Sequence, residues 1–305
     1  MTGDFFGQIN VYSGSSYTLK NSFKPHSNGI VRIKQSPFSN VNGIKLVGTG
    51  SLDNTVKLWN PLGWSLLRTY TDHSAAVNDL EFINETTIAS GDYGSKIKVW
   101  LLNSGQTLLT INTNNPVWSL KVLDKNGNQL AAGLISKIIN IYNLNDGSLV
   151  ATLIGHTKGI NDMTLMSNGL LASASDDYDV RIWNLNTYAS VYTFVGHTNL
   201  VVSLKQVTTD ILASASDEGA IKFWNITNGK LLRNLGGHTK NIEWSLDMLN
   251  AQTLVSGSWD QTIKLWNWKT GDCVRIIEAN MQIRSLAVIT TPGIESNTTS
   301  KQFKF

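Results

Sequence analysis

The sequence predicts an all-β protein built from one repeated unit, because a short strand-like phrase recurs along almost the whole chain. Each copy closes on an aromatic residue, and successive copies lie 41 or 42 residues apart. The six copies are TVKLWN at Trp59, KIKVWL at Trp100, IINIYN at Tyr142, DVRIWN at Trp183, AIKFWN at Trp224 and TIKLWN at Trp266. A repeat of this length indicates a radial or stacked architecture rather than ordinary globular domains.

Each unit contains four stretches that fit short β-strands. In the fourth unit these are INDMTLM, GLLASAS, DVRIWNL and SVYTFVG, which are rich in β-branched and apolar residues. Turn-forming pairs such as Asn168-Gly169 and Asn228-Gly229 separate such strands. A four-stranded sheet buries both faces only when other sheets pack on either side of it. A closed ring of sheets supplies those neighbours and also protects the strand edges.

A seventh unit is divided between the two ends of the chain. The opening DFFGQINVYS places Tyr12 where DYGSKIKVWL places Trp100, and 47 residues separate Tyr12 from Trp59. We expect the first residues to supply the third and fourth strands of this unit, and the last residues to supply its first strand, IRSLAVIT, and a second strand in the tail KQFKF. The chain is therefore expected to form one domain over residues 1–305, closed by about residues 1–20 and 282–305.

These features resemble the WD-repeat β-propeller family. The resemblance rests on GHTKGINDM…LLASASDDYDVRIWN, GHTNLVVSL…ILASASDEGAIKFWN and GGHTKNIEWSL…LVSGSWDQTIKLWN, and it covers nearly the whole chain. The family's closing Trp-Asp is mostly Trp-Asn here, which is a minor departure because the second residue only leads out of the strand. The resemblance implies a seven-bladed β-propeller of four-stranded antiparallel blades, with the closing blade shared by N- and C-terminal strands.

All five histidines occupy one place in the repeat. In the family that the chain resembles, this histidine links a Trp indole, a Ser or Thr hydroxyl and an Asp carboxylate into a buried hydrogen-bonded chain. The matching residues are His26, Thr49, Asp53 and Trp59 in blade one; His156, Ser173, Asp177 and Trp183 in blade four; His197, Ser214 and Trp224 in blade five; and His238, Ser256, Asp260 and Trp266 in blade six.

The other blades depart from this pattern. Blade five has Glu218 where Asp is expected, and blade two has Gly94 there. The remaining replacements are Thr113, Ser136 and Tyr142 in blade three and Ala279, Phe6 and Tyr12 in the closing blade. We expect blades two, three and seven to be the softer part of the ring, because they lack members of the chain.

Neither catalysis nor metal binding is expected. Equivalent positions in successive blades lie far apart, so the histidines cannot converge on a zinc ion. A Ser-His-Asp nucleophile would occur once in a cleft, whereas this trio repeats and is capped by an indole. The sequence has no phosphate-binding glycine loop and no cofactor motif, and the acidic run at Asp176 lacks the spacing of a calcium loop. The single Cys273 is expected to be a buried or edge thiol.

Composition and charge restrict the setting. The net charge is +3 with both signs interspersed, so nucleic acid is an unfavoured partner. One cysteine cannot form an internal disulfide, which favours a reducing compartment. The sequence shows no membrane-spanning stretch and no signal peptide, so we expect a cytoplasmic or nuclear protein.

The resemblance also implies a binding face. In the family, the narrow top face is built from two sets of residues. One set directly precedes the turn Asp that supplies the carboxylate of the hydrogen-bonded chain, and the other set opens each first strand. The first set is Phe5, Leu52, Tyr93, Ile135, Asp176, Asp217 and Trp259, and the second includes Asn78, Trp118, Asn161, Val202, Trp244 and Arg284. Aromatic anchors beside an acidic arc are typical of interface hot spots.

The leading interpretation is an interaction scaffold, because no catalytic constellation accompanies this face. Its expected partner is a protein or peptide segment with basic and apolar or aromatic residues. Nucleic-acid binding and carbohydrate binding by the aromatic residues remain alternatives, and an enzyme with a pocket in the central channel is a third. The chain is either a stand-alone adaptor or a propeller from a longer protein, and it acts as a monomer or as a subunit of a larger assembly.

Overall fold

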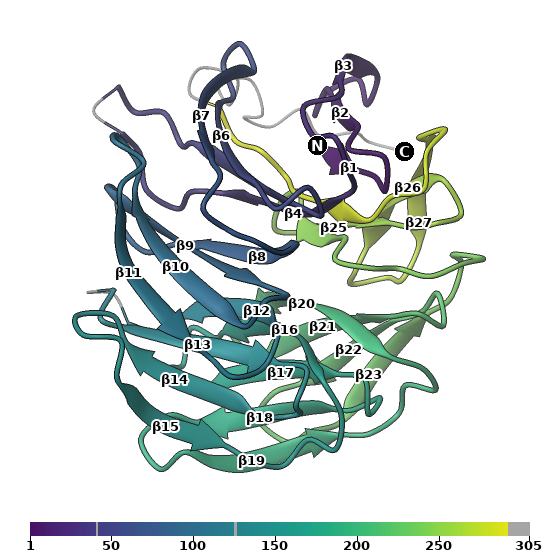
Figure 1. Ribbon diagram of the computed structural model, residues 1–305. Helices are drawn as coiled ribbons and strands as arrows, with labels where there is room; N and C mark the ends of the chain where they lie inside the picture. The colour runs from purple at the N-terminus through teal and green to yellow at the C-terminus, as the bar shows by residue number, and fades with distance from the viewer. Residues whose placement is uncertain (41, 125–126, 292–305) are drawn as a thin grey trace.

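Seven four-stranded antiparallel sheets make up the computed structural model, which describes residues 1–40, 42–124 and 127–291. The sheets are the blades of a β-propeller and lie around a common axis (Figure 1). The described residues contain no helix. The predicted fold class is therefore confirmed, including the sharing of one blade between both ends of the chain.

The strands follow the repeat, with the first strand of each blade at the channel and the fourth at the rim. Blades one to three are β4 (Ile30–Gln35), β5 (Val47–Ser51), β6 (Val56–Asn60) and β7 (Ser65–Tyr70); β8 (Val77–Phe82), β9 (Thr87–Asp92), β10 (Lys96–Leu101) and β11 (Thr107–Asn112); and β12 (Val117–Val122), β13 (Gln129–Leu134), β14 (Ile139–Asn143) and β15 (Leu149–Leu153).

Blades four to six continue this order. They are β16 (Ile160–Leu165), β17 (Leu171–Ser175), β18 (Val180–Asn184) and β19 (Ala189–Phe194); β20 (Val201–Thr208), β21 (Ile211–Ser216), β22 (Ile221–Asn225) and β23 (Leu231–Leu235); and β24 (Leu246–Met248), β25 (Thr253–Gly257), β26 (Thr262–Asn267) and β27 (Cys273–Glu278). The outermost strand is the most exposed in each blade, and Cys273 lies there as an exposed thiol on an edge strand.

Blade seven joins the two ends of the chain in the order β28 (Ser285–Leu286), β1 (Thr2–Gly3), β2 (Ile9–Tyr12) and β3 (Leu19–Phe23). Figure 1 shows the purple N-terminal strands beside the yellow C-terminal part of the chain. One detail of the prediction was wrong: the second strand is β1, from the N-terminus, so this end supplies three strands rather than two. The segment KQFKF, expected to form that strand, lies outside the described residues.

Apolar side chains between neighbouring blades form the core. The closing aromatic of each repeat packs there, and Trp100, Trp183 and Trp224 are each only 1% exposed. Two glycines show how closely the blades approach: a Cβ atom on Gly91 would lie 2.4 Å from a methyl of Val117, and one on Gly133 would lie 2.7 Å from a methyl of Ile160. Because such distances are sterically forbidden, these positions require glycine.

Candidate partner-binding face

The histidines form repeated hydrogen-bonded chains that hold the loops of the top face in place. In blade four, Trp183 Nε1 donates to Ser173 Oγ at 2.8 Å, and the ring of His156 bonds Ser173 at 2.8 Å and Asp177 at 2.8 Å. The same connections join the expected residues in blades one, five and six, with Glu218 serving as the carboxylate in blade five. These side chains are buried and paired, so they are not available for a ligand.

Blade two corrects one expectation. His73 bonds Ser90 and Asp92 at 2.7 Å each, and Trp100 Nε1 donates to Ser90 at 2.7 Å. The carboxylate therefore comes from Asp92, two positions before Gly94, where the sequence comparison had looked for it. Asp92 is the last residue of β9, and its carboxylate takes the role that a turn residue has in the other blades. Blade two therefore has a complete hydrogen-bonded chain, and the reason for expecting it to be less stable than the other blades does not apply.

Burial and hydrogen bonding shift the pKa values of Asp177 in blade four and His197 in blade five. Burial acts to raise the pKa of Asp177, but the hydrogen bonds from His156 and from the Thr157 and Asp179 amides outweigh it and hold this pKa at about 2. Burial lowers the pKa of His197 to about 4 despite its bond to Glu218. A neutral ring that donates from Nδ1 to the carboxylate and accepts at Nε2 from the serine hydroxyl satisfies every atom of the chain.

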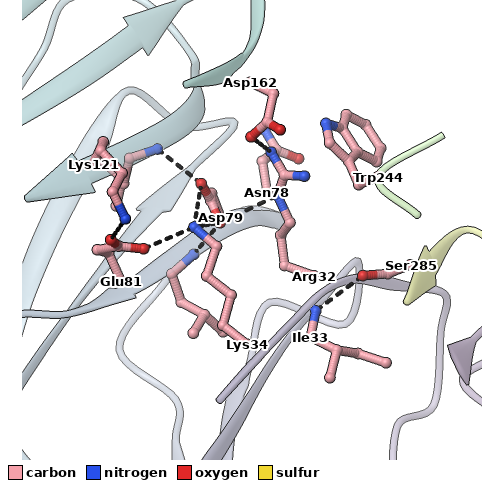
Figure 2. A network of polar contacts seen from close by, with 12 residues as sticks. Arg32, Ile33, Lys34, Asn78, Asp79, Glu81, Lys121, Asp162, Trp244 and Ser285 are labelled. Atoms are coloured by element: carbon pink, nitrogen blue, oxygen red, sulfur yellow. Dashed lines mark hydrogen bonds and ion pairs between the residues drawn. The ribbon is translucent and has the colours of Figure 1, made fainter. Parts of the chain in front are cut away.

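Below the top face, one side chain crosses the central channel. Arg32 of β4 lies 3.2 Å from Asp79 of blade two and 3.2 Å from Asp162 of blade four, and its guanidinium stacks 4.9 Å from the ring centre of Trp244 in blade six (Figure 2). The same guanidinium donates to the Asn161 carbonyl at 3.1 Å, and so does the indole of Trp244 at 2.9 Å. Arg32 is only 4% exposed. These contacts join blades one, two, four and six across the channel, below its upper mouth.

A second layer of charges lies beneath Arg32. Lys34 pairs with Asp79 and Glu81 at 2.9 Å each, and Lys121 also pairs with Glu81 (Figure 2). Burial would raise the pKa of Glu81, but the two lysines outweigh it and hold that pKa at about 2. Together with Arg32, these pairs bind the inner strands of blades one, two and three to one another.

The residues before the turn carboxylates share one backbone contact. In each case the amide N–H donates to a carbonyl at the entrance of the first strand of the same blade, as Tyr93 does to Ala76 at 2.9 Å and Asp217 to Leu200 at 3.0 Å. The other residues with this contact are Leu52, Ile135, Asp176 and Trp259. The repeated contact places these six residues on the same face, beside the loops that lead into the channel.

Two of them form an acidic arc at the upper mouth of the channel. Asp176 and Asp217 are half-buried on adjacent blades, and Oδ1 of Asp217 is buried without a hydrogen-bond partner among the described residues. Burial and the charge of Asp176 raise the pKa of Asp217 to about 6. Burial is also the main reason that the pKa of Glu243, in blade six, is raised to about 7. Three acidic side chains are therefore close together in this part of the mouth.

Aromatic side chains lie beside this arc. The rings of Phe5 and Trp259 meet edge to face with 5.0 Å between their centres. Arg284 stacks 4.7 Å from the ring centre of Phe5 and 5.5 Å from that of Trp244, and it pairs with Glu243 at 3.3 Å. Burial lowers the pKa of Arg284. Blades four to seven thus bring an acidic arc and an aromatic wall together at the upper mouth of the channel.

The remaining expected residues are distributed more widely. Leu52, Trp118 and Ile135 are half-buried on blades one and three, and Tyr93 is 54% exposed on blade two. Asn161 does not fit the expectation of a partner contact, because it is 2% exposed and its amide donates to Asp176 at 2.7 Å and to the Val201 carbonyl. It positions Asp176 rather than reaching solvent. Phe6, considered only as a replacement in the closing blade, is 71% exposed next to Phe5.

Sequence reasoning missed Arg32 and Glu243. Arg32 is the only basic residue at its repeat position, where the other blades carry Asp79, Ser119, Asp162, Ser203, Ser245 and Ser285. That departure was a usable signal of a channel-crossing contact. Glu243 directly precedes Trp244 in a first strand whose upper part is irregular, and its approach to Arg284 depends on that backbone path.

The repeat family can now be assigned by comparison. The family model described as "WD domain, G-beta repeat" matches residues 17–60, 64–100, 147–184, 188–225 and 229–267, which is more than half of the chain. The chain belongs to the WD-repeat family. The stretches without a match contain most of blade three and the start of the chain, where Tyr142 and Tyr12 replace the closing Trp.

Similar proteins are themselves much longer than the matched part. Periodic tryptophan protein 2 of Arabidopsis thaliana is 26% identical over 179 residues, which is 57% of this chain and 19% of that protein. Pre-mRNA-processing factor 17 of Homo sapiens is 27% identical over 57% of this chain and 28% of its own length. E3 ubiquitin-protein ligase COP1 of Pisum sativum is 28% identical over 44% of this chain and 20% of its own length. The WD-repeat chain thus matches less than a third of each of these relatives.

The described part of the WD-repeat chain contains no helix that is both long and apolar enough to cross a membrane. It also contains no group of three or more His, Cys, Asp or Glu side chains arranged to hold a metal ion.

Proposed function

We propose that this protein is a non-catalytic interaction scaffold that binds a partner protein through the upper mouth of its channel. The carrying observation is the grouping of Asp176, Asp217 and Glu243 beside Phe5 and Trp259 at the upper mouth. WD-repeat propellers in general serve as platforms for protein partners, and similar proteins include a pre-mRNA-processing factor and an E3 ubiquitin-protein ligase. The specific face and partner are our proposal.

The charged groups at the upper mouth indicate which side chains a partner would need. Arg284 approaches Glu243 at the upper mouth, and its Nη1 and the Trp259 indole N–H are buried without acceptors among the described residues, whereas Oδ1 of Asp217 is buried there without a donor. A lysine or arginine side chain would supply the missing donors, and its methylene groups would pack on the aromatic wall. We therefore expect a peptide segment with one basic residue next to an apolar or aromatic one. Nucleic acid fits poorly, because the upper mouth presents carboxylates where phosphates would lie.

The wider setting follows from the same proposal. The partner-binding face would serve a larger assembly, with the propeller as one subunit. The single exposed Cys273 fits a reducing compartment, and we propose a cytoplasmic or nuclear location. No membrane partner is proposed.

Affinity purification with mass spectrometry tests the assignment. We would compare the unmodified chain with Asp217→Asn/Trp259→Ala and with the matched control Asp146→Asn/Asp210→Asn, whose exposed carboxylates lie in turns at the opposite face. Partners that are lost only from the first variant would place recognition at the upper mouth. If both variants retain every partner of the unmodified chain, the assignment to this face is wrong.

A direct binding measurement separates the chemical alternatives. Short fluorescent peptides with a central Phe-Arg pair should bind at least tenfold more tightly than peptides in which citrulline replaces arginine, because citrulline lacks the charge. Single-stranded oligonucleotides and a glycan panel are measured in parallel. Tighter binding of an oligonucleotide with a steep dependence on salt, or of a glycan, would overturn the protein-partner proposal in favour of that ligand class.

A further inference from the structure

Aromatic rings and guanidinium groups alternate in a row that leads from the top face into the central channel. Trp259 meets Phe5 with 5.0 Å between the ring centres, and Arg284 lies 4.7 Å from the ring centre of Phe5. The same guanidinium lies 5.5 Å from the ring centre of Trp244, and Arg32 stacks 4.9 Å from that ring (Figure 2). Arg284 therefore already occupies an aromatic cation site at the upper mouth.

The two arginines of this row differ in how well their charge is paired. Arg32 donates to Asp79 and Asp162 at 3.2 Å each and to a backbone carbonyl at 3.1 Å. Arg284 has one ion-pair partner among the described residues, Glu243 at 3.3 Å, and its Nη1 is buried there without an acceptor. Release of Arg284 into water would break one long ion pair and restore the hydration of its guanidinium.

The carboxyl groups beside Arg284 are also incompletely paired. Burial raises the pKa of Glu243 to about 7, and the charge of Asp217 adds to this rise although Arg284 opposes it. Burial lowers the pKa of Arg284 itself. Both members of the ion pair thus lose more by burial than their partner restores. A cation from another chain could pair with the same carboxyl groups.

The backbone allows the side chain of Arg284 to leave. Arg284 is the last residue of the irregular segment 279–284 between β27 and β28. Its backbone N–H donates to the Gly3 carbonyl at 2.9 Å, so the main chain is held while the side chain carries no strand pairing. Rotation of the side chain away from Glu243 therefore breaks no strand.

We propose that Arg284 occupies the site of the partner's basic residue, and that an arginine of the partner replaces it beside Phe5, Trp244 and Glu243. This inference rests on the proposed function, because it concerns the same mouth and the same basic segment. Arg284 moves into solvent when the partner binds, and the apolar residue of the partner contacts Trp259. The internal arginine sets the specificity, because a lone basic side chain does not displace it without these additional contacts.

Removal of the internal arginine tests the proposal. The Arg284→Ala protein should bind the Phe-Arg peptide about fivefold more tightly than the unmodified chain, because no side chain then has to be displaced. The matched control is Arg275→Ala, which removes the same charge from exposed β27, where Arg275 stacks 4.7 Å from the ring centre of Tyr17. Binding to Arg284→Ala that is no tighter than binding to Arg275→Ala would overturn the inference. The proposed function would still stand if Asp217→Asn/Trp259→Ala abolished binding.

Hydrogen exchange at the arginine side chains gives a second test, which requires no variant to fold. NMR spectroscopy of the unmodified chain would follow the Nε–H protons with and without saturating peptide. Exchange at Arg284 should accelerate about tenfold in the complex, whereas exchange at Arg32, which stays buried, should not change. Unchanged protection of Arg284 in the complex would contradict its displacement.

A small cation separates this inference from the proposed function. Ethylguanidinium should raise the melting temperature of Arg284→Ala by about 2 °C without affecting Arg275→Ala or the unmodified chain, because only the vacated site can bind it. If it does so although no peptide binds, the partner assignment is wrong and the inferred cation site is supported. If neither ethylguanidinium nor the peptide distinguishes Arg284→Ala from Arg275→Ala, the inference is wrong.

Discussion

Single residues in this propeller stabilise the fold through the hydrogen bonds that link them into buried chains. In each complete chain the indole donates to the hydroxyl, the hydroxyl donates to the imidazole, and the imidazole donates to the carboxylate. The Asp177 carboxylate accepts a further bond from the Thr157 backbone amide at 2.8 Å, so it also fixes the loop that enters blade four. Removal of one member leaves a buried donor without an acceptor, which is more harmful than the bond itself is stabilising.

Asp177→Ala should therefore lower the free energy of unfolding by about 2 kcal/mol. The His156 ring and the Thr157 amide both lose their acceptor, and the side chain of Asp177 is only 6% exposed. Urea denaturation monitored by tryptophan fluorescence would measure the change. Asp179→Ala, two residues away and half-exposed, is the matched control and should change stability by less than about 0.5 kcal/mol. Equal effects of the two substitutions would contradict the structural role of the chain.

The raised pKa of Glu243 predicts that the stability of the folded protein falls as pH rises. Its pKa is about 7 in the folded protein, mainly because of burial, and near 4.5 when unfolded, so the folded state binds more protons between these values. Stability therefore falls as pH rises from about 4.5 to 7. Glu243→Gln removes this penalty and should raise the melting temperature at pH 8 more than at pH 5, despite the lost attraction to Arg284. An exposed control, Glu278→Gln, should show no such difference. An equal effect of Glu243→Gln at both pH values would show that the carboxyl group is not held protonated.

At the scale of the element, blades two and three differ in what secures their loops. Blade two has the complete chain through Asp92, which also accepts the Lys96 amide at 2.8 Å. Blade three instead has Thr113, whose hydroxyl donates to the Asn115 carbonyl, and Tyr142, whose hydroxyl accepts from Asn140 at 3.0 Å. These contacts are local, so they do not join the entering loop to the second and third strands.

Asp92→Ala should consequently destabilise blade two, whereas Ser136→Ala at the turn position of blade three should have almost no effect. We expect a loss of about 2 kcal/mol for Asp92→Ala, because its carboxylate is fully buried between His73 and the Lys96 amide. Hydrogen exchange followed by mass spectrometry would locate the change, with faster exchange confined to β9 and β10 in the first variant. A smaller effect for Asp92→Ala than for Ser136→Ala would contradict the assignment of the carboxylate to Asp92.

Most elements of the fold were predictable from the sequence because each repeat carries its own strand pattern and turn residues. The exceptions arose where a contact depends on the backbone path rather than on a fixed offset. Asp92 reaches His73 from two positions before the expected site, and β1 enters blade seven although only two of its residues pair on both sides. At the upper mouth, the approach of Glu243 to Arg284 depends on the irregular start of the first strand of blade six, which no periodic pattern reveals.

The ring is closed by short strand pairing in blade seven and is stabilised by ion pairs across its central channel. In blade seven, β28 and β1 pair through only two residues each. Across the channel, by contrast, Arg32 joins blades one, two and four through its ion pairs and contacts blade six by stacking on Trp244. The channel contacts therefore resist the opening that the short strands of blade seven would otherwise permit.

Arg32→Met should reveal how much the ring depends on this side chain. Methionine keeps much of the apolar stem but leaves the Asp162 carboxylate without its ion-pair partner and Asp79 with Lys34 alone, so we expect a loss of about 3 kcal/mol. Burial already raises the pKa of Asp162 even with Arg32 present. The additional substitution Asp162→Asn should recover part of the loss, because it removes the carboxylate that has lost its ion-pair partner. Urea denaturation of the two single variants and the double variant measures this coupling. If the effects of the two substitutions are simply additive, the arginine does not act through Asp162, and its contribution to the ring must come from Asp79 and Trp244 alone.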